Sequence, residues 1–201
     1  MSDNKKTVVL LRGGIDSSVC LAQAVEDFGK NKVIALNLYY GEERKKEREA
    51  AKRIAEYYRV EYIELDISNT VDGIKKDIPF KNGLMISTAA SVALSKGAGS
   101  IQFAVHSDES AGHARPDCRE SFYRTMATAI NEGTDGELKL VLPFTDMSKK
   151  QVMMLGMKLG VPFVHTWSCY KSKEKPCGKC LGCEGRAKAF ALIDEEDPLL
   201  K

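Results

Sequence analysis

The sequence lacks any apolar run long enough to span a membrane. A membrane-spanning helix needs about 18 or more predominantly apolar residues, and no stretch of this chain approaches that length. The opening residues, MSDNKKT, also lack the apolar stretch of a secretory signal peptide. These absences predict a cytoplasmic protein without a membrane partner.

An excess of charge of one sign is also missing. Thirty Lys and Arg residues against 28 Asp and Glu residues leave a formal net charge of +2, so bulk charge gives no support for direct nucleic-acid binding. The chain contains neither Gly-x-x-x-x-Gly-Lys-Ser/Thr nor Gly-x-Gly-x-x-Gly, the signatures of Walker-type ATPases and of dinucleotide-binding folds. Internal repeats and low-complexity segments are absent as well.

Short apolar strands and helix-periodic segments alternate along most of the 201 residues. The strands are expected at residues 7–11, 32–40, 60–66, 100–106 and 138–144, and the helices at 17–28, 42–58, 84–97, 119–133 and 148–160. This alternation predicts an α/β fold, a parallel sheet with helices on both faces. Residues 1–162 are expected to form that domain, and residues 163–201 a metal-binding segment with a C-terminal helix packed on it.

Four of the six cysteines lie close together near the C-terminus. These are Cys169, Cys177, Cys180 and Cys183. Because a reducing cytoplasm does not favour structural disulfides, the clustering favours a metal. Four thiolates close a tetrahedral zinc site, which would be structural, although similar spacing occurs in iron–sulfur ligation and unliganded thiols are a third alternative. Cys20, by contrast, reads as a core residue of the first helix.

The stretch LLRGGIDSS joins the first strand to the first helix. Gly13 and Gly14 allow backbone N–H groups to approach an anion at the positive end of the helix dipole. Asp16, Ser17 and Ser18 add a carboxylate and two hydroxyl groups for phosphate or Mg²⁺. Taken alone, the segment also fits a tight turn capped by an aspartate.

Within this stretch, RGGIDSS resembles the SGGxDS pyrophosphate loop of the N-type ATP pyrophosphatases. The resemblance is greatest to one family in this group, the QueC family of 7-cyano-7-deazaguanine synthases. It extends to later segments: LNLYYGEERKKE, IPFKNGLMISTAASVA, SDESAGHARPDCRESF, LPFTDMSKKQVMMLG, and TWSCY…PCGKCLGCEGRAKAF. The fold implied is adenine nucleotide alpha hydrolase-like and Rossmann-like, with a small C-terminal zinc-binding flap.

The resemblance implies an ATP site bound with Mg²⁺. Its implied members are Leu10, Leu11, Arg12, Gly13, Gly14, Ile15, Asp16, Ser17 and Ser18 at the phosphates, with Leu38 and Tyr39 beside the adenine. The implied catalytic residues are Asp16, Ser17 and Lys149. A lysine such as Lys149 neutralises charge on the phosphates, although without the resemblance it also reads as a solvent-exposed helix lysine.

The second substrate is implied to bind between two polar segments, FKNG at residues 80–83 and SDESAGHARPDCRE at residues 107–120. The implied members of this site are Lys81, Asn82, Asp108, Arg115, Asp117 and Arg119, and His106 and His113 border it. An aspartate would accept hydrogen bonds from a guanine-like edge, and an arginine would pair with a carboxylate. On composition alone, a solvated charged loop explains the second of these segments equally well.

The implied reaction is that of a carbon–nitrogen ligase. ATP adenylates 7-carboxy-7-deazaguanine, ammonia displaces AMP to give an amide, and a second ATP activates the amide for elimination to the nitrile. The family also implies a homodimer. An inactive paralogue, an enzyme that stops at the amide, one acting on another acceptor, and a tRNA thiolase are the alternatives.

The chain departs from the family pattern at Arg12, where the family has serine. An arginine brings a charge and a fork of donors but much more bulk than a serine hydroxyl. It could bind phosphate, fold away into solvent, or block the loop.

Overall fold

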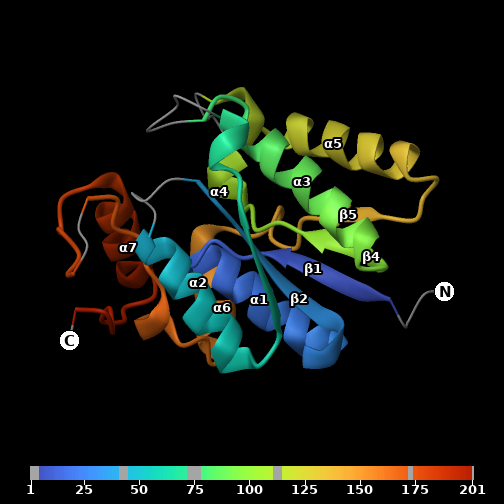
Figure 1. The fold of residues 1–201 in the computed structure, drawn as a ribbon. Helices are drawn as coiled ribbons and strands as arrows, with labels where there is room; N and C mark the ends of the chain where they lie inside the picture. The colour runs from blue at the N-terminus through green and yellow to red at the C-terminus, as the bar shows by residue number, and fades with distance from the viewer. Residues whose placement is uncertain (1–4, 41–44, 72–77, 111–114, 172–173, 201) are drawn as a thin grey trace.

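A computed structural model describes residues 5–40, 45–71, 78–110, 115–171 and 174–200 (Figure 1). Five parallel strands form one sheet in the order β3-β2-β1-β4-β5. The strands are β1 (Lys6–Leu10), β2 (Val33–Tyr39), β3 (Glu61–Asp66), β4 (Ala98–Gln102) and β5 (Lys139–Val141). The order reverses between β1 and β4, and ligands of such sheets bind outside the carboxyl ends of the strands at that point.

Helices cover both faces of the sheet, as the alternating pattern predicts (Figure 1). One face carries α1 (Ile15–Phe28), α2 (Lys45–Tyr58) and α6 (Lys149–Lys158), and the other carries α3 (Lys81–Ser95) and α5 (Glu120–Gly133). Each face has its own core, because alternate residues of β1 point to opposite sides: Val9 packs with α1 and α2, whereas Val8 packs with α3 and α5. The predicted fold class is confirmed.

Shorter helical elements lie between these, at α4 (Ser107–Ser110), η1 (Lys30–Lys32), η3 (Ser68–Val71), η4 (Pro116–Cys118) and η5 (Phe163–His165). The last helix, α7 (Leu181–Ala191), lies near the carboxyl ends of the strands. Its Ala189 and Phe190 join Phe163 in the same core cluster as Val9. The C-terminal segment therefore shares a core with the sheet. No helix in the described part of the chain is long and apolar enough to cross a membrane.

Two strands end at least three residues before their predicted ends. The fourth ends at Gln102 rather than residue 106, and the fifth spans only Lys139–Val141 rather than residues 138–144. Pro143 has no N–H group to donate to a neighbouring strand, which accounts for the early end of β5. The residues directly after Gln102 therefore form a loop at the carboxyl edge of the sheet.

Helix α3 begins three residues before its predicted start, at Lys81. Phe80, at the N-cap, has φ 53° and makes no side-chain cap hydrogen bond. The cap comes instead from another part of the chain, because the Asn82 N–H donates to Asp117 Oδ2 at 2.9 Å. The sequence pattern could not show this contact, since its partners are 35 residues apart.

Candidate active site

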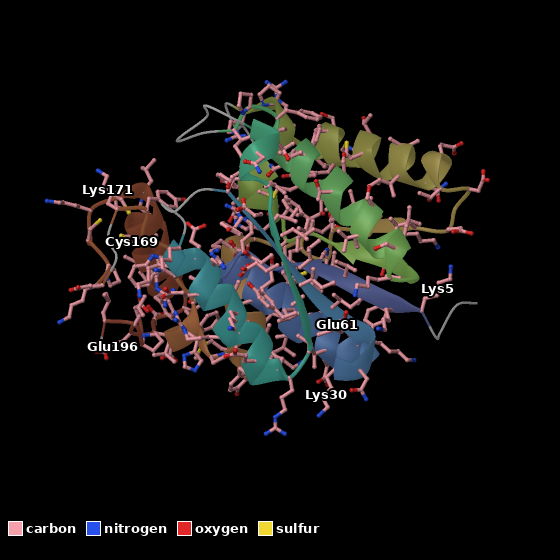
Figure 2. The ribbon with its side chains drawn as sticks, viewed as in Figure 1. Lys5, Lys30, Glu61, Cys169, Lys171 and Glu196 are labelled. Atoms are coloured by element: carbon pink, nitrogen blue, oxygen red, sulfur yellow. The ribbon has the colours of Figure 1, made fainter. Side chains whose placement is uncertain are left out.

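A cavity of about 560 Å³ opens at the carboxyl ends of β1 and β4. Its walls come from the loop after β1, the loop after β4, the start of α6, and α7 with the segment before it. Cys169 and Lys171 mark this end of the molecule, and Lys5 and Glu61 lie at the opposite end (Figure 2). The cavity therefore lies at the switch point where this fold binds ligands.

The glycine turn is held by hydroxyl groups from the first turn of α1. Ser17 Oγ accepts from the Arg12 N–H at 3.2 Å and donates to the Gly14 carbonyl at 3.2 Å. Ser18 Oγ donates to the same carbonyl at 2.8 Å. No side chain caps α1 at Gly14, so the first N–H groups of the helix are available to an anion.

Gly13 allows the turn to lie directly against α2. Its φ is +82°, in the region that favours glycine, and a Cβ here would lie 2.2 Å from the Glu47 carbonyl oxygen and 2.7 Å from the Ala51 nitrogen. Both neighbours are backbone atoms of a helix and cannot yield. The first glycine of RGGIDSS is thus explained by close packing against α2.

Asp16 and Lys149 meet across the cavity although 133 residues separate them. Lys149 Nζ forms an ion pair with Asp16 Oδ1, and both residues line the cavity. The capping box of Ser148 and Gln151 fixes the start of α6. Asp108 Oδ2 also accepts from the Lys149 N–H at 2.8 Å. The starts of α1, α4 and α6 are therefore joined around one lysine.

Arg12 lines this cavity and a second, smaller one. It is partly exposed, and its guanidinium group makes no hydrogen bond or ion pair with the described part of the chain. The smaller cavity, about 20 Å³, also contains Leu38 and Tyr39. Arg12 thus lies in the wall between the loop and the end of β2.

The end of β2 is fixed to the glycine turn by Asn37. This buried residue donates from Nδ2 to the Leu11 carbonyl at 2.7 Å. Beside it, the Arg48 guanidinium lies 4.3 Å from the centre of the Tyr39 ring, and the Tyr39 hydroxyl donates to Asp66 at 2.8 Å. The predicted adenine-binding residues Leu38 and Tyr39 are therefore adjacent to the turn.

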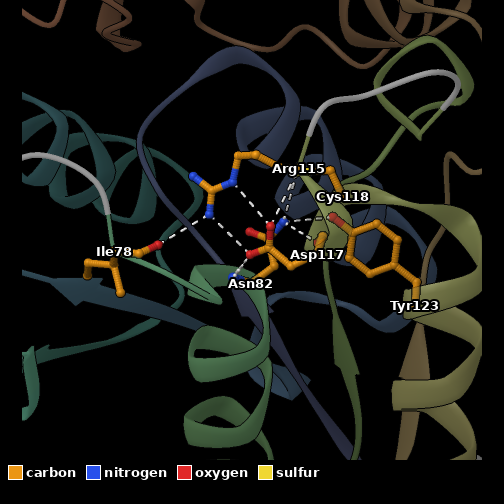
Figure 3. Close-up of polar contacts among 6 residues, drawn as sticks. All are labelled: Ile78, Asn82, Arg115, Asp117, Cys118 and Tyr123. Carbon is orange, nitrogen blue, oxygen red and sulfur yellow. Dashed lines mark hydrogen bonds and ion pairs between the residues drawn. The ribbon is translucent and has the colours of Figure 1, made fainter.

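A separate polar cluster joins the start of α3 to η4 (Figure 3). The Asp117 carboxylate accepts from Arg115 Nε and Nη2, each at 3.1 Å, as well as from the Asn82 N–H. Asn82 Nδ2 donates to the Asp117 carbonyl at 2.8 Å and to the Tyr123 hydroxyl at 3.0 Å. Three predicted substrate residues are thus bonded to one another.

Of the six predicted substrate residues, only Asp108 lines the large cavity. Lys81 Nζ lies 5.8 Å from the centre of the Tyr40 ring, and Arg119 is exposed at the N-cap of α5. His106 also lines the large cavity, whereas His113 lies outside the described residues.

Asp117 provides a pH-dependent contribution to stability. Burial raises its pKa, but hydrogen bonds from the Arg115 guanidinium and the Asn82 N–H outweigh this and place the pKa below its usual value. A carboxyl group whose pKa is lower in the folded than in the unfolded protein stabilises the fold at pH values above its unfolded-state pKa. This stabilisation is lost as the pH falls through the folded-state pKa. We expect Asp117→Asn to lower the free energy of unfolding by about 2 kcal/mol at pH 7. In urea titrations, the difference from wild type should shrink below about pH 4; an equal difference at every pH would contradict this role.

The four clustered cysteines converge, with all their Sγ atoms within 4.8 Å of one another. Cys177 and Cys183 have their sulfur atoms 4.0 Å apart, as do Cys180 and Cys169. Four sulfurs on one zinc ion at 2.3 Å would be ~3.8 Å apart, so the donor set and spacing fit a single ion. In a 4Fe-4S cluster each thiolate binds a different iron, which requires a wider spacing.

Backbone N–H groups donate to two of these sulfurs, those of Cys169 and Cys180, and such donors favour the thiolate, the form that binds metal. Cys169 Sγ accepts from the Lys171 and Cys177 N–H groups at 3.4 and 3.3 Å. Burial raises the pKa of Cys180, but N–H donors including that of Tyr170 lower it to about 6. Cys20 behaves differently: it is fully buried, and burial raises its pKa. This confirms it as a core residue.

Sequence reasoning missed the wall formed by α7 and the segment before it. Residues here that line the cavity include Trp167, Ser168, Tyr170, Leu181, Gly182, Gly185, Arg186 and Lys188. One signal was available in Gly182, where a Cβ would lie 1.8 Å from the Ser168 carbonyl oxygen. That glycine permits the close approach of α7 to the segment that carries Trp167.

Solved structures support the fold. The chain superimposes on NMN synthetase from Francisella tularensis with a TM-score of 0.59 and 18% identity, covering 96% of this chain and 78% of that one. U34-tRNA thiolase NcsA from Methanococcus maripaludis, solved with its 4Fe-4S cluster, gives a TM-score of 0.58 and 19% identity over 95% of this chain and 65% of that one. At these identities the likeness establishes the architecture alone.

Sequence relatives are much closer. The 7-cyano-7-deazaguanine synthase of Nitratiruptor sp. is 36% identical over 218 residues, covering 96% of this chain and 97% of the relative. That of Archaeoglobus fulgidus is 34% identical over 220 residues, covering 97% and 90%. The family described as "Queuosine biosynthesis protein QueC" matches residues 6–76 and 68–194. With the glycine turn, the cavity and the four cysteines in place, the chain belongs to the QueC family.

Proposed function

We propose that this chain is an ATP-dependent carbon–nitrogen ligase that converts 7-carboxy-7-deazaguanine and ammonia to 7-cyano-7-deazaguanine in queuosine or another 7-deazaguanine pathway. The observation that carries the proposal is the meeting of the glycine turn, Asp16 and Lys149 in one cavity of a QueC-family chain. The named activity of its full-length relatives supports the same reaction.

The reaction requires two activations of the same carbon. A carboxylate reacts poorly with ammonia because oxide is a poor leaving group, so its oxygen attacks the α-phosphate of ATP and pyrophosphate leaves. Ammonia then displaces AMP to give the amide and loses a proton. The amide oxygen attacks a second ATP in the same way, and elimination of AMP with loss of two protons gives the nitrile. No protein nucleophile is needed.

The protein contributes by placing the phosphates and neutralising their charge. We assign the phosphates to the uncapped N-terminus of α1 and the glycine turn, and the adenine to Leu38 and Tyr39 at the end of β2. Ser17 orders the turn through its two hydrogen bonds. Lys149 supplies positive charge where the pyrophosphate leaves, and its pairing with Asp16 holds it there in the absence of ATP.

Asp16 can bind Mg²⁺ in addition to pairing with Lys149. Its Oδ1 contacts Lys149, while its Oδ2 makes no hydrogen bond within the described residues. A carboxylate oxygen at the edge of a phosphate site is a usual Mg²⁺ ligand. When bound, the ion would supply charge neutralisation at the phosphates.

For the deazaguanine we retain the six predicted residues, in three roles. Asp108 lines the cavity, whereas Asn82, Arg115 and Asp117 form a preorganised cluster beside α3. Lys81 and Arg119 supply cationic groups near that cluster for the substrate carboxylate. The proposal requires the deazaguanine to extend from the cavity toward this cluster.

We assign zinc, in a structural role, to the four cysteines. The support is the sulfur spacing, which fits one tetrahedral ion with no open position. Elemental analysis of protein purified without added metal should find about one zinc per chain and no acid-labile sulfide. Stoichiometric iron with sulfide would show a cluster instead and would overturn the assignment.

Arg12 is assigned to phosphate binding. Its place in the wall of both cavities, without an ion pair in the described part of the chain, supports this role over folding away. Replacing Arg12 by serine should raise KM for ATP at least about tenfold, since a hydrogen bond between charged groups is lost. An unchanged or lower KM would show instead that the arginine is dispensable or obstructive.

Product analysis tests the overall assignment. The protein is incubated with MgATP, ammonia and 7-carboxy-7-deazaguanine, and products are followed by mass spectrometry. The amide should appear first and the nitrile later, with AMP and pyrophosphate. Accumulation of the amide alone would favour an amide-forming paralogue, and absence of both products would overturn the synthase proposal.

The near-neutral net charge supports a free base rather than a nucleic acid as acceptor, and we extend the proposal to a cytoplasmic homodimer.

A further inference from the structure

The single tryptophan of the chain lies between the glycine turn and the four-cysteine site. Trp167 is 5% exposed. Its backbone N–H donates to the Gly13 carbonyl at 2.8 Å, and its indole Nε1–H donates to the Cys169 carbonyl at 2.8 Å. One residue is therefore bonded both to the turn and to a residue of the four-cysteine site.

Packing around this tryptophan leaves little room for independent movement. Trp167 forms one apolar cluster with Cys169, Cys180, Cys183 and Ala50 of α2. On its other side, Gly13 lies so close to the α2 backbone that no Cβ fits. The turn is thus enclosed between α2 and Trp167, and a shift of the tryptophan must displace the turn or break the hydrogen bond to it.

A second connection runs from α7, which carries Cys183, to the residue before Trp167. Arg186, 4% exposed, donates from Nη1 to Thr166 Oγ1 at 2.6 Å and from Nη2 to the Phe163 carbonyl at 3.0 Å. Cys169 and Cys183 are thereby connected to the Trp167 segment from both sides. An ion that fixes these two cysteines also fixes the segment that bonds to the turn.

We propose that metal occupancy of the four-cysteine site and binding of MgATP at the glycine turn are energetically coupled through Trp167. The inference rests on the proposed function, because it takes the turn to be the ATP site. Coupling between binding sites is reciprocal: the metal strengthens ATP binding, and ATP strengthens metal retention by the same factor. Trp167 acts here as a positioning residue that need not touch the reacting atoms.

The direct test measures zinc affinity with and without nucleotide. The Zn²⁺-loaded protein is titrated with a chromogenic zinc chelator, and MgATP should raise its apparent affinity for zinc about tenfold, within the usual range for coupled sites. Free ATP itself competes for zinc, so greater retention cannot arise from the nucleotide in solution. The reciprocal measurement, by calorimetry at a temperature at which circular dichroism shows the zinc-free protein to be folded, should show a Kd for MgATP about tenfold higher after zinc removal.

Trp167→Phe removes the indole N–H and keeps an aromatic ring. In this variant the coupling factor should fall below about threefold, with circular dichroism showing that the fold is retained. Tyr123→Phe is the matched control: it also removes one polar group from a buried aromatic, on the other face of the sheet. It should leave the coupling factor at its wild-type value.

The outcomes separate the inference from the proposed function. If MgATP fails to bind the zinc-loaded wild type, the assignment of the turn as an ATP site is wrong. If MgATP binds equally well with and without zinc, or if Trp167→Phe keeps the full coupling, the inference is overturned while the proposed function stands. If Trp167→Phe cannot retain zinc, the wild-type calorimetry alone decides.

Discussion

Replacing Lys149 by methionine should lower kcat for nitrile formation by about 10²- to 10³-fold, the usual effect of removing one charge-stabilising group. Lys149 is the cation held beside the glycine turn, through its ion pair with Asp16. Its place at the start of α6 is fixed by the Ser148 capping box and by Asp108. Methionine preserves most of the length of the side chain, so the change isolates the charge. KM for ATP should change less than kcat, because the charge matters most when pyrophosphate leaves.

Lys150→Met is the matched control for this substitution. It removes the same charge from the next residue of the same helix, where the side chain is exposed and does not line the cavity. Steady-state assays of AMP release should find Lys150→Met close to wild type. A Lys149→Met protein that keeps kcat within about threefold of wild type would show that the lysine is not part of the catalytic machinery.

Replacing Cys180 by serine should cost the protein a large part of its stability. Cys180 is 4% exposed and belongs to the cluster that contains Trp167. Structural zinc contributes about 10–16 kcal/mol of apparent binding free energy in zinc-finger peptides, so losing even part of such a contribution is large beside the stability of a domain. We expect zinc content to fall to near zero and Tm to fall by at least about 10 °C.

Cys118→Ser provides the comparison, because it makes the same chemical change in a partly buried cysteine outside the metal cluster. Its Tm should stay within a few degrees of wild type, and its zinc content should be unchanged. Differential scanning calorimetry with metal analysis of both variants decides the matter. A Cys180→Ser protein with normal zinc content and normal Tm would show that the cysteines do not form the expected site.

The fold could be predicted because its signals are local. Buried apolar strands and periodic helices alternate, and in a chain of this size that pattern allows few arrangements other than a parallel sheet covered on both faces. The cysteine cluster was equally accessible, since three of its members lie within seven residues of one another on a turn and at the start of α7. The glycine turn was visible from its position between strand and helix.

The internal arrangement of the site depends on contacts between distant residues. Asp16 and Lys149 are 133 residues apart, and the cap that Asp117 provides to α3 spans 35. Nothing in either local segment indicates its partner. For the same reason, the sequence did not indicate that α7 forms a wall of the cavity. It also did not indicate the role of Trp167, whose N–H donates to the carbonyl of Gly13 near the other end of the sequence.

The effect of arginine at position 12 could not be predicted from the sequence motif. A serine in its place would contribute a small hydroxyl group, whereas arginine carries a charge into the wall shared by two cavities. The turn itself is intact around it, with the Arg12 N–H bonded to Ser17. The backbone of the turn therefore accommodates Arg12, and we expect the arginine to affect ligand binding rather than the fold.

Isotope transfer shows whether one site adenylates, in turn, both oxygens of the same carboxyl carbon. With 7-carboxy-7-deazaguanine carrying ¹⁸O in both carboxylate oxygens, each activation should transfer one labelled oxygen to AMP. We expect two AMP per nitrile, each with a single ¹⁸O, and unlabelled pyrophosphate by mass spectrometry. Label appearing in inorganic phosphate with release of ADP, or AMP without label, would contradict it.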